Sequence, residues 1–281
     1  MNSARVFLLT AIAMIAFAAN SLLCRVALKQ TAIDAATFTL VRIAAGALVL
    51  WLLTRTRYVS LGKSGSWFSA AALFIYAAAF SFAYRTLPAG TGALLLFAAV
   101  QATMILWGWH KGERLQPIQF VGLALALCGL FVLVFPGISA PPLIGSLLML
   151  SAGIAWGVYS LRGKKAGDAT NATTGNFIRA VPFAIVLAVA ALPWMRFDAA
   201  GFALALISGA IASGLGYVIW YSVLPNLRAA SAATVQLSVP VIAAMGGILL
   251  LGERVTIRFV IAAFAVLGGI ALVVLERRRA K

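Results

Sequence analysis

Ten apolar runs of about 20 residues, separated by short polar connections, divide the sequence. About 20 mostly apolar residues is the length that an α-helix needs to cross a bilayer. Backbone N–H and C=O groups in hydrocarbon must be paired within their own segment, so each run is predicted to be a helix. The runs lie at residues 5–25, 35–54, 67–87, 89–109, 117–135, 142–161, 175–195, 201–221, 229–251 and 257–275. The predicted fold class is therefore an all-α polytopic membrane protein with ten transmembrane helices.

The composition agrees with a lipid environment. Hydrophobic residues make up 63% of the 281 residues and charged residues 10%, with a mean hydropathy of +1.04. A soluble domain has about 45–50% apolar and about 25% charged residues. We therefore expect membrane lipid to be the main partner of the surface, with no room for a soluble domain.

The net charge of +16 follows the connections between the runs. Fourteen of the 22 Lys and Arg residues fall on one predicted side of the membrane, six on the other, and two inside runs. Lys and Arg concentrate on the cytoplasmic side of membrane proteins. This pattern predicts a multi-pass protein of a bacterial-type cytoplasmic (inner) membrane with both termini in the cytoplasm, and no nucleic-acid partner.

The first run also allows a second interpretation. Arg5 precedes the apolar stretch 6–15, and Ala16-Phe17-Ala18 matches the small-residue pattern of a signal-peptide cleavage site. The internal repeat described next counts against a signal peptide, because the repeat needs this run as the first span of its first half.

The sequence repeats itself at a shift of 137 residues. Identities that this shift aligns are Arg25 with Arg162, Arg42 with Arg179, Tyr84 with Tyr221, Leu87 with Leu224 and Pro88 with Pro225. Gly112-Glu113-Arg114 also recurs as Gly252-Glu253-Arg254, at a shift of 140. The predicted halves are 1–137 and 138–281, with five spans each.

Five is an odd number, so the second half enters the membrane from the opposite face. Such inverted repeats are typical of secondary transporters, in which the substrate path lies between the halves near the bilayer midplane. The turns after Tyr84 and Tyr221 then lie at opposite faces, either as matched structural turns or as the two mouths of one path.

Ten spans in two halves, each with a small-residue-rich fourth span leading into Gly-Glu-Arg, resemble the EamA-type drug/metabolite transporters. The residues that carry the resemblance are 89–114 and 229–254. The length and the aromatic-rich spans are most similar to the bacterial aromatic amino-acid exporters of the YddG type. The resemblance implies a transporter, not an enzyme, that exports small metabolites such as aromatic or neutral amino acids by alternating access and needs no cofactor.

Hydroxyls and aromatic rings share one face of the third and eighth spans. The residues are Tyr76, Phe80 and Tyr84 and, 137 positions later, Ser213, Tyr217 and Tyr221. Residues four apart lie on one helix face, and such a face suits a substrate with a ring and polar groups. The alternative is an interfacial aromatic belt. A belt explains Tyr84 and Tyr221 better than it explains Tyr76 or Ser213.

Other polar or aromatic residues inside spans complete the predicted substrate pathway. They are Asn20, Ser21, Gln101, Trp156, Tyr159, Gln236 and Ser238. An unpaired amide in hydrocarbon costs several kcal/mol, so each must meet a neighbouring helix or a wet cavity. A hydrogen bond between helices is the alternative to a place on the pathway.

Two arginines, Arg42 and Arg179, lie about two turns inside their predicted helices. They could reach back to the interface or attract a substrate carboxylate. The six Asp and Glu residues all fall in connections or at helix ends. Export of a cationic drug usually uses an acid within the membrane, so this arrangement favours a neutral or zwitterionic solute.

Other classes of membrane protein lack support in the sequence. An intramembrane lipid-modifying enzyme needs a nucleophile, base or metal site. Cys24, Cys128 and His110 show no such spacing, so no catalytic residue and no metal is predicted. A channel usually shows a filter or a charged ring, and neither is visible in the sequence. The runner-up within transporters is another metabolite or a drug as cargo; the oligomeric state is left open, a monomer included.

Overall fold

The structure is a computed structural model that describes residues 3–55, 64–112, 116–137, 139–163, 168–227 and 229–276, with the backbone alone at 229–231, 233, 275 and 276. Several predicted cytoplasmic cations and the pair Glu113 and Arg114 lie outside the described residues. Ten helical segments of the described chain are long and apolar enough to cross a membrane, which confirms the predicted number of spans and the all-α fold class.

Five helices form the first half of the chain. They are α1 (Ser3–Gln30), α2 (Ala35–Thr54), α3 (Trp67–Tyr84), α4 (Ala89–His110) and α5 (Pro117–Val134). The predicted ranges agree with these bounds to within a few residues, except that α1 runs five residues beyond its predicted end. The apolar run therefore underestimates α1, because the helix continues past Arg25 and includes the polar residues Lys29 and Gln30.

Two of the five spans in the second half are interrupted. The uninterrupted spans are α6 (Leu143–Gly163), α7 (Ala169–Ala190) and α12 (Ile257–Glu276). The eighth span consists of α8 (Ala199–Ile207), the π-helical segment η2 (Ser208–Leu215), α9 (Gly216–Val223) and the short η3 (Leu224–Asn226), and η1 (Leu192–Trp194) precedes it. The ninth span consists of α10 (Ala229–Gln236) and α11 (Ser238–Leu251).

Local chemistry explains where these helices begin and end. Asp34 caps α2, and Asp168 and Asp198 cap α7 and α8, each with a side-chain oxygen that accepts a backbone N–H of the first turn. Gly252 ends α11 in the left-handed conformation, with φ 62°. The break between α10 and α11 falls at Leu237, because Pro240 has no N–H to donate and its ring crowds the preceding turn.

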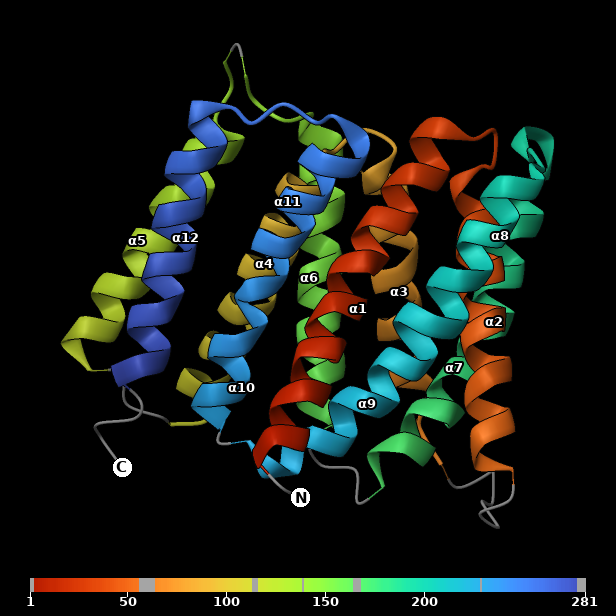
Figure 1. Cartoon of the computed structure of the whole chain (residues 1–281), viewed down its shortest axis with the longest axis horizontal. Helices are drawn as coiled ribbons and strands as arrows, with labels where there is room; N and C mark the ends of the chain where they lie inside the picture. Colours follow the sequence, from red (N-terminus) through yellow and green to blue (C-terminus); the bar gives the residue numbers. More distant parts are fainter. Residues whose placement is uncertain are drawn as a thin grey trace.

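The spans pack as pairs that join the two halves (Figure 1). α5 packs along α12 at one edge of the bundle, and α2 packs along α7 and η2 at the other. Between them, α4 contacts α11 and α6, and α1 contacts α9 and α11. The start of α1 and the end of α12 lie at the same end of the bundle. α1 is thus an integral part of the core, as the repeat predicted.

Large apolar side chains point outward along the spans. Examples are Phe7, Leu249, Ile257 and Phe264, which are between 77% and 81% exposed. In water such a surface would be unfavourable, whereas in a bilayer it meets acyl chains. The polar side chains inside the bundle are consequently the informative ones for function.

Asp34 ties the α1–α2 turn to the segment before α8, and its loss should destabilise the protein. Its Oδ2 accepts the N–H of Arg196 at 3.0 Å. Burial by itself raises the pKa of the Asp34 carboxyl, but hydrogen bonds from the Thr37 hydroxyl and from the N–H groups of Arg196, Thr37 and Ala36 outweigh burial and hold the pKa below its ordinary value.

We expect Asp34→Ala to lower the free energy of unfolding by about 1–2 kcal/mol at neutral pH, measured by thermal unfolding in detergent. Because the folded state favours the ionised form, this contribution is full above the carboxyl's unfolded pKa and disappears as the pH falls through the lowered folded pKa. Asp198→Ala removes a cap that accepts only the N–H of Gly201 in the described structure, so it should lower the free energy of unfolding by less. Equal losses for both variants would contradict the role given to Arg196.

Candidate functional site

Five polar side chains form one hydrogen-bonded cluster in the middle of the bundle, which we call the central cluster. Its members are Asn20, Arg42, Tyr76, Ser208 and Ser213. Arg42 donates from Nη2 to the Tyr76 hydroxyl at 2.9 Å and from Nε to Ser213 Oγ at 3.3 Å. Asn20 Nδ2 donates to the Tyr76 hydroxyl at 3.3 Å, and Ser208 Oγ donates to Asn20 Oδ1 at 2.6 Å. All five are buried, so the cluster is a polar island in an apolar core.

The central cluster needs four elements at once. Asn20 comes from α1, Arg42 from α2, Tyr76 from α3, and both serines come from η2. In an α-helix, residues five apart point in different directions, whereas the i→i+5 bonds of a π-helix bring such residues towards one face. The π-helical turn therefore explains how Ser208 and Ser213 both reach the cluster. Such turns occur frequently at functional sites.

Close backbone contact fixes the position of Arg42. A Cβ atom on Gly209 would overlap the carbonyl oxygen of Arg42, and Gly46 on α2 lies against the ring of Phe177 and the Gly209 carbonyl. Small residues at these positions let α2 and η2 approach more closely than ordinary helices. The Arg42 guanidinium thus extends from the closely packed contact between α2 and η2, and not from a loop.

Arg42 does not reach the interface. It is 2% exposed, and its guanidinium carbon lies 5.1 Å from the centre of the Tyr76 ring and 4.8 Å from that of Phe80. The interpretation that Arg42 extends towards the membrane surface is therefore wrong. Arg179 behaves differently: its Nη1 donates to the backbone carbonyls of Ser64, which precedes α3, and of Gly175 in the first half of α7.

Six of the predicted aromatic residues form a continuous column. The ring centres of Tyr84, Phe80, Tyr76 and Trp156 follow one another at 4.7, 5.5 and 4.8 Å, and Trp156 contacts both Tyr159 at 5.3 Å and Tyr217 at 5.0 Å. The column starts at the last residue of α3 and reaches the last turns of α6. These two helices run in opposite directions through the bundle (Figure 1). It therefore extends across much of the membrane depth and passes the central cluster at Tyr76.

Other predicted residues lie outside the central cluster. Gln101 is buried with no hydrogen-bond partner for its Nε2, and Ser238 donates to the carbonyl of Val235 within its own chain segment. Gln236 ends α10, and the Tyr221 hydroxyl lies near Gly163 at the end of α6. Ser21 is buried beside Tyr84. The structure thus gathers Asn20, Tyr76 and Ser213 and leaves these five outside their hydrogen bonds.

The second Gly-Glu-Arg sequence forms a buried ion pair at the end of the bundle opposite the chain termini. Arg25 Nε lies 3.0 Å from Glu253 Oε1, and both side chains are 8% exposed. Arg25 Nη1 also donates to the carbonyls of Tyr84 and Arg85, while Glu253 Oε2 accepts the N–H of Ala89 at 2.8 Å. The pair therefore joins α1, the α3–α4 turn and the α11–α12 turn, which gives this Gly-Glu-Arg sequence a structural role.

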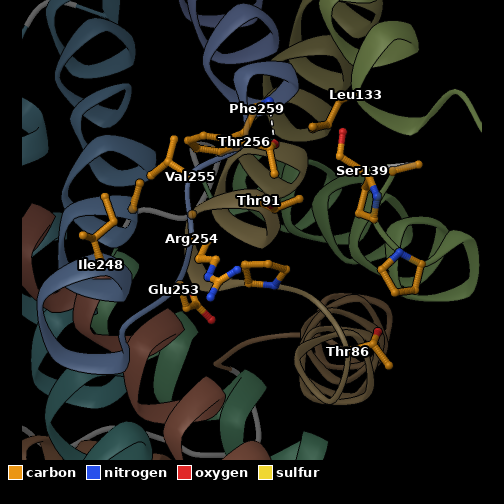
Figure 2. Close-up of a pocket in the computed structure, with 16 residues that line it drawn as sticks. Thr86, Thr91, Leu133, Ser139, Ile248, Glu253, Arg254, Val255, Thr256 and Phe259 are labelled. Atoms are coloured by element: carbon orange, nitrogen blue, oxygen red, sulfur yellow. Dashed lines mark hydrogen bonds between the residues drawn. The ribbon is translucent and has the colours of Figure 1, made fainter. Parts of the chain in front are cut away.

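A pocket of about 250 Å³ opens next to this ion pair (Figure 2). The turn that follows Tyr84 contributes Thr86 and Pro88 to its wall, and the second Gly-Glu-Arg sequence contributes Glu253 and Arg254. Figure 2 shows the Arg254 side chain among the lining residues, with Thr91 and Ser139 supplying hydroxyls. The turn at Pro88 thus borders an opening at this end of the bundle.

Arg42 and Ser208 were not among the predicted pathway residues. An arginine inside a span is itself a signal of function, and that signal was available in the sequence. Ser208 was not predictable from helical spacing, because its orientation depends on the π-helical turn. Phe17 on α1 also joins the site, with its ring centre 5.8 Å from that of Tyr217.

A ten-span bundle around a buried polar cluster and an aromatic column is the architecture of an integral membrane transporter. Residues 143–275 match the EamA-like transporter family. A protein of Pseudomonas aeruginosa that has not been characterised is 56% identical over 278 residues, which cover 99% of this chain and 97% of that protein. The chain belongs to the EamA-like transporter family.

Two named Escherichia coli proteins show a more distant similarity. The threonine/homoserine exporter RhtA is 30% identical over 185 residues, 63% of this chain and 59% of that protein. A probable amino-acid metabolite efflux pump is 27% identical over 192 residues, 60% of this chain and 62% of that protein. A crystal structure with 18% sequence identity matches all of both chains with a TM-score of 0.68, which shows the same fold.

Proposed function

We propose that this transporter exports small neutral or zwitterionic amino acids, and that the central cluster is where they bind. The observation that carries the proposal is a fully buried arginine among two serines, an asparagine and a tyrosine, beside a column of aromatic rings. Relatives named as a threonine/homoserine exporter and a probable amino-acid metabolite efflux pump support this class of cargo. Another metabolite of similar size and polarity is the alternative.

We further propose alternating access between inverted repeats, residues 1–137 and 138–281. The packing supports this division, because a two-fold axis between the halves would bring equivalent spans together. α2 packs on α7, α4 on α11 and α5 on α12, each time the second, fourth and fifth span of one half on its counterpart. α6 packs on α3, and α1 correspondingly packs on α8, η2 and α9.

The orientation that we propose places both termini in the cytoplasm. The start of α1 and the end of α12 share one end of the bundle (Figure 1). Arg55 and Lys111 follow the ends of α2 and α4 on this side, and Arg162 lies in the last turn of α6. The positive-inside rule then makes the pocket beside Glu253 face the outside.

Efflux from proteoliposomes loaded with single amino acids tests the proposed cargo. The panel contains threonine, homoserine, methionine, phenylalanine, tyrosine, tryptophan and small neutral amino acids, each labelled. We expect efflux of at least one member that protein-free liposomes do not show. Failure of the whole panel would reject amino-acid export.

The two tyrosines beside Trp156 should be needed for transport but not for insertion. We expect Tyr76→Ala and Tyr217→Ala to reduce efflux by about tenfold or more, because Tyr76 accepts a hydrogen bond from a charged group and both rings line the column. The variant Tyr76→Phe removes the hydroxyl and keeps the ring, so it distinguishes the contribution of the hydroxyl to efflux from that of the ring. Phe264→Ala removes a ring that is 78% exposed on α12 and should leave efflux unchanged. Normal flux in both tyrosine variants would remove them from the pathway.

A further inference from the structure

Arg42 carries a hydrogen-bond donor that points at no acceptor. Its Nη1 is buried and has no hydrogen-bond partner, although Nε and Nη2 of the same guanidinium are both bonded. Buried polar groups are nearly always paired, so an unpaired one in a functional centre indicates a missing partner. The missing partner must be an acceptor, because an arginine has no acceptor of its own to offer.

No carboxylate among the side chains that the structure describes neutralises this charge. Asp34, Asp168 and Asp198 cap helices, and Glu253 pairs with Arg25, the one ion pair among the residues that the structure describes. A buried cation without a counter-charge is strongly unfavourable. A negatively charged group arriving at Nη1 would therefore be bound more strongly than a neutral acceptor of the same shape.

The neighbours of Arg42 suit one particular anion. The hydroxyls of Tyr76 and Ser213 accept from Arg42 and still have their own protons to donate. Nη1 and two hydroxyls can together serve the two oxygens of a carboxylate. The rings of Trp156 and Tyr217, 5.0 Å apart between centres, lie beside this site and can hold the apolar part of the same molecule.

We propose that Arg42 binds the carboxylate of the transported molecule through Nη1, with the hydroxyls of Tyr76 and Ser213 completing the site. The identity of the cargo as an amino acid rests on the proposed function, whereas the carboxylate requirement rests on the guanidinium alone. Arg42 is then the residue that separates carboxylates from neutral or cationic relatives of similar size.

Arg179 offers a matched control. It stands 137 positions after Arg42 in the sequence, but its Nη1 donates to backbone carbonyls of Ser64 and Gly175 instead of facing the aromatic column. Its removal changes the charge of the protein by the same amount without touching the central cluster.

The test measures ligand-dependent thermal stability of the purified protein in detergent, because a ligand that binds the folded state raises Tm with its concentration. Each of threonine and phenylalanine is titrated beside its amide and its methyl ester, and benzoate serves as a carboxylate without an amino group. With the wild-type protein, we expect at least one free acid to bind about 10- to 100-fold more tightly than its amide or ester, the value of a hydrogen bond to a charged group.

Variants then test which residue causes the preference for the free acid. We expect Arg42→Gln to remove the preference for the acid, Arg42→Lys to retain part of it, and Arg179→Gln to retain all of it. The comparison of acids with amides needs only the wild-type protein, so it decides the question even if Arg42→Gln fails to fold.

The outcomes separate the two proposals. Equal binding of acid, amide and ester, or a full preference in Arg42→Gln, overturns the carboxylate site and leaves amino-acid export standing. Binding of benzoate through Arg42 without binding or efflux of any amino acid keeps the site and rejects amino-acid export. A wild-type protein that no carboxylate stabilises overturns the site.

Discussion

Replacing Glu253 with glutamine should lower the free energy of unfolding by about 3–5 kcal/mol, the usual loss when one partner of a buried ion pair is removed. The remaining partner, Arg25, has a side chain that is 8% exposed and loses its counter-charge, so two backbone carbonyls and a neutral amide oxygen are left as its acceptors. The same change weakens the acceptor for the N–H of Ala89 at the start of α4. Thermal and denaturant unfolding in detergent measure the loss.

Two controls identify the ion pair as the cause. In the double variant Arg25→Met with Glu253→Met, much of the stability should return, because replacing both partners of a buried pair by apolar residues is often nearly neutral. Arg254→Gln changes an exposed neighbour of Glu253 and should stay within about 0.5 kcal/mol of the wild type. A Glu253→Gln protein as stable as the wild type would show that the pair contributes little.

The position of the pair gives it a consequence for transport. It connects α1 with the α3–α4 turn and the α11–α12 turn, and these two turns border the pocket beside Pro88. Under alternating access, the α1 and α11 ends must separate for this end of the bundle to open further. Arg25 and Glu253 would then part in the open state and meet in the closed one.

The spans were predictable because hydrocarbon imposes both their length and their composition. Interruptions inside spans were not, since they depend on tertiary packing. The ninth run reads as a single apolar stretch, yet the chain breaks at Leu237, three residues before Pro240. Likewise, nothing in the eighth run announces the π-helical turn at Ser208–Leu215.

The site was predictable where a polar group inside a span must meet either a neighbouring helix or a wet cavity. Asn20, Tyr76 and Ser213 were predicted for this reason and lie together, although their role in transport stays a prediction. Arg42 was harder, because an arginine two turns from a helix end can either extend to the interface or stay inside. Packing decides between the two: the close contact of Gly209 with the Arg42 backbone and the rings of Tyr76 and Phe80 hold it inside.

Replacing Arg42 with methionine should abolish transport of carboxylates while leaving the protein about as stable as the wild type, or more stable. Burial of an unpaired charge costs several kcal/mol, and methionine removes that cost. Two hydrogen bonds to the guanidinium are lost in exchange, each worth about 1.5–3 kcal/mol. Methionine also fills the space beside Tyr76 and Phe80 with a flexible apolar chain.

The comparison with Arg25 makes this prediction decisive. Both arginines are buried, with 6% of the whole residue exposed for Arg25 and 2% for Arg42. Arg25 has a carboxylate partner in the chain, and Arg42 has none among the described residues. Arg25→Met should therefore lose about 3–5 kcal/mol of unfolding free energy, because it strands Glu253, while Arg42→Met stays within about 1 kcal/mol of the wild type or gains stability. Unfolding free energy and proteoliposome efflux, measured on the same preparations, distinguish a role in stability from a role in transport. An Arg42→Met protein that unfolds as readily as Arg25→Met would mean that Arg42 maintains the fold. One that is stable but inactive would mean that the chain keeps a costly charge at its centre for the molecule it transports.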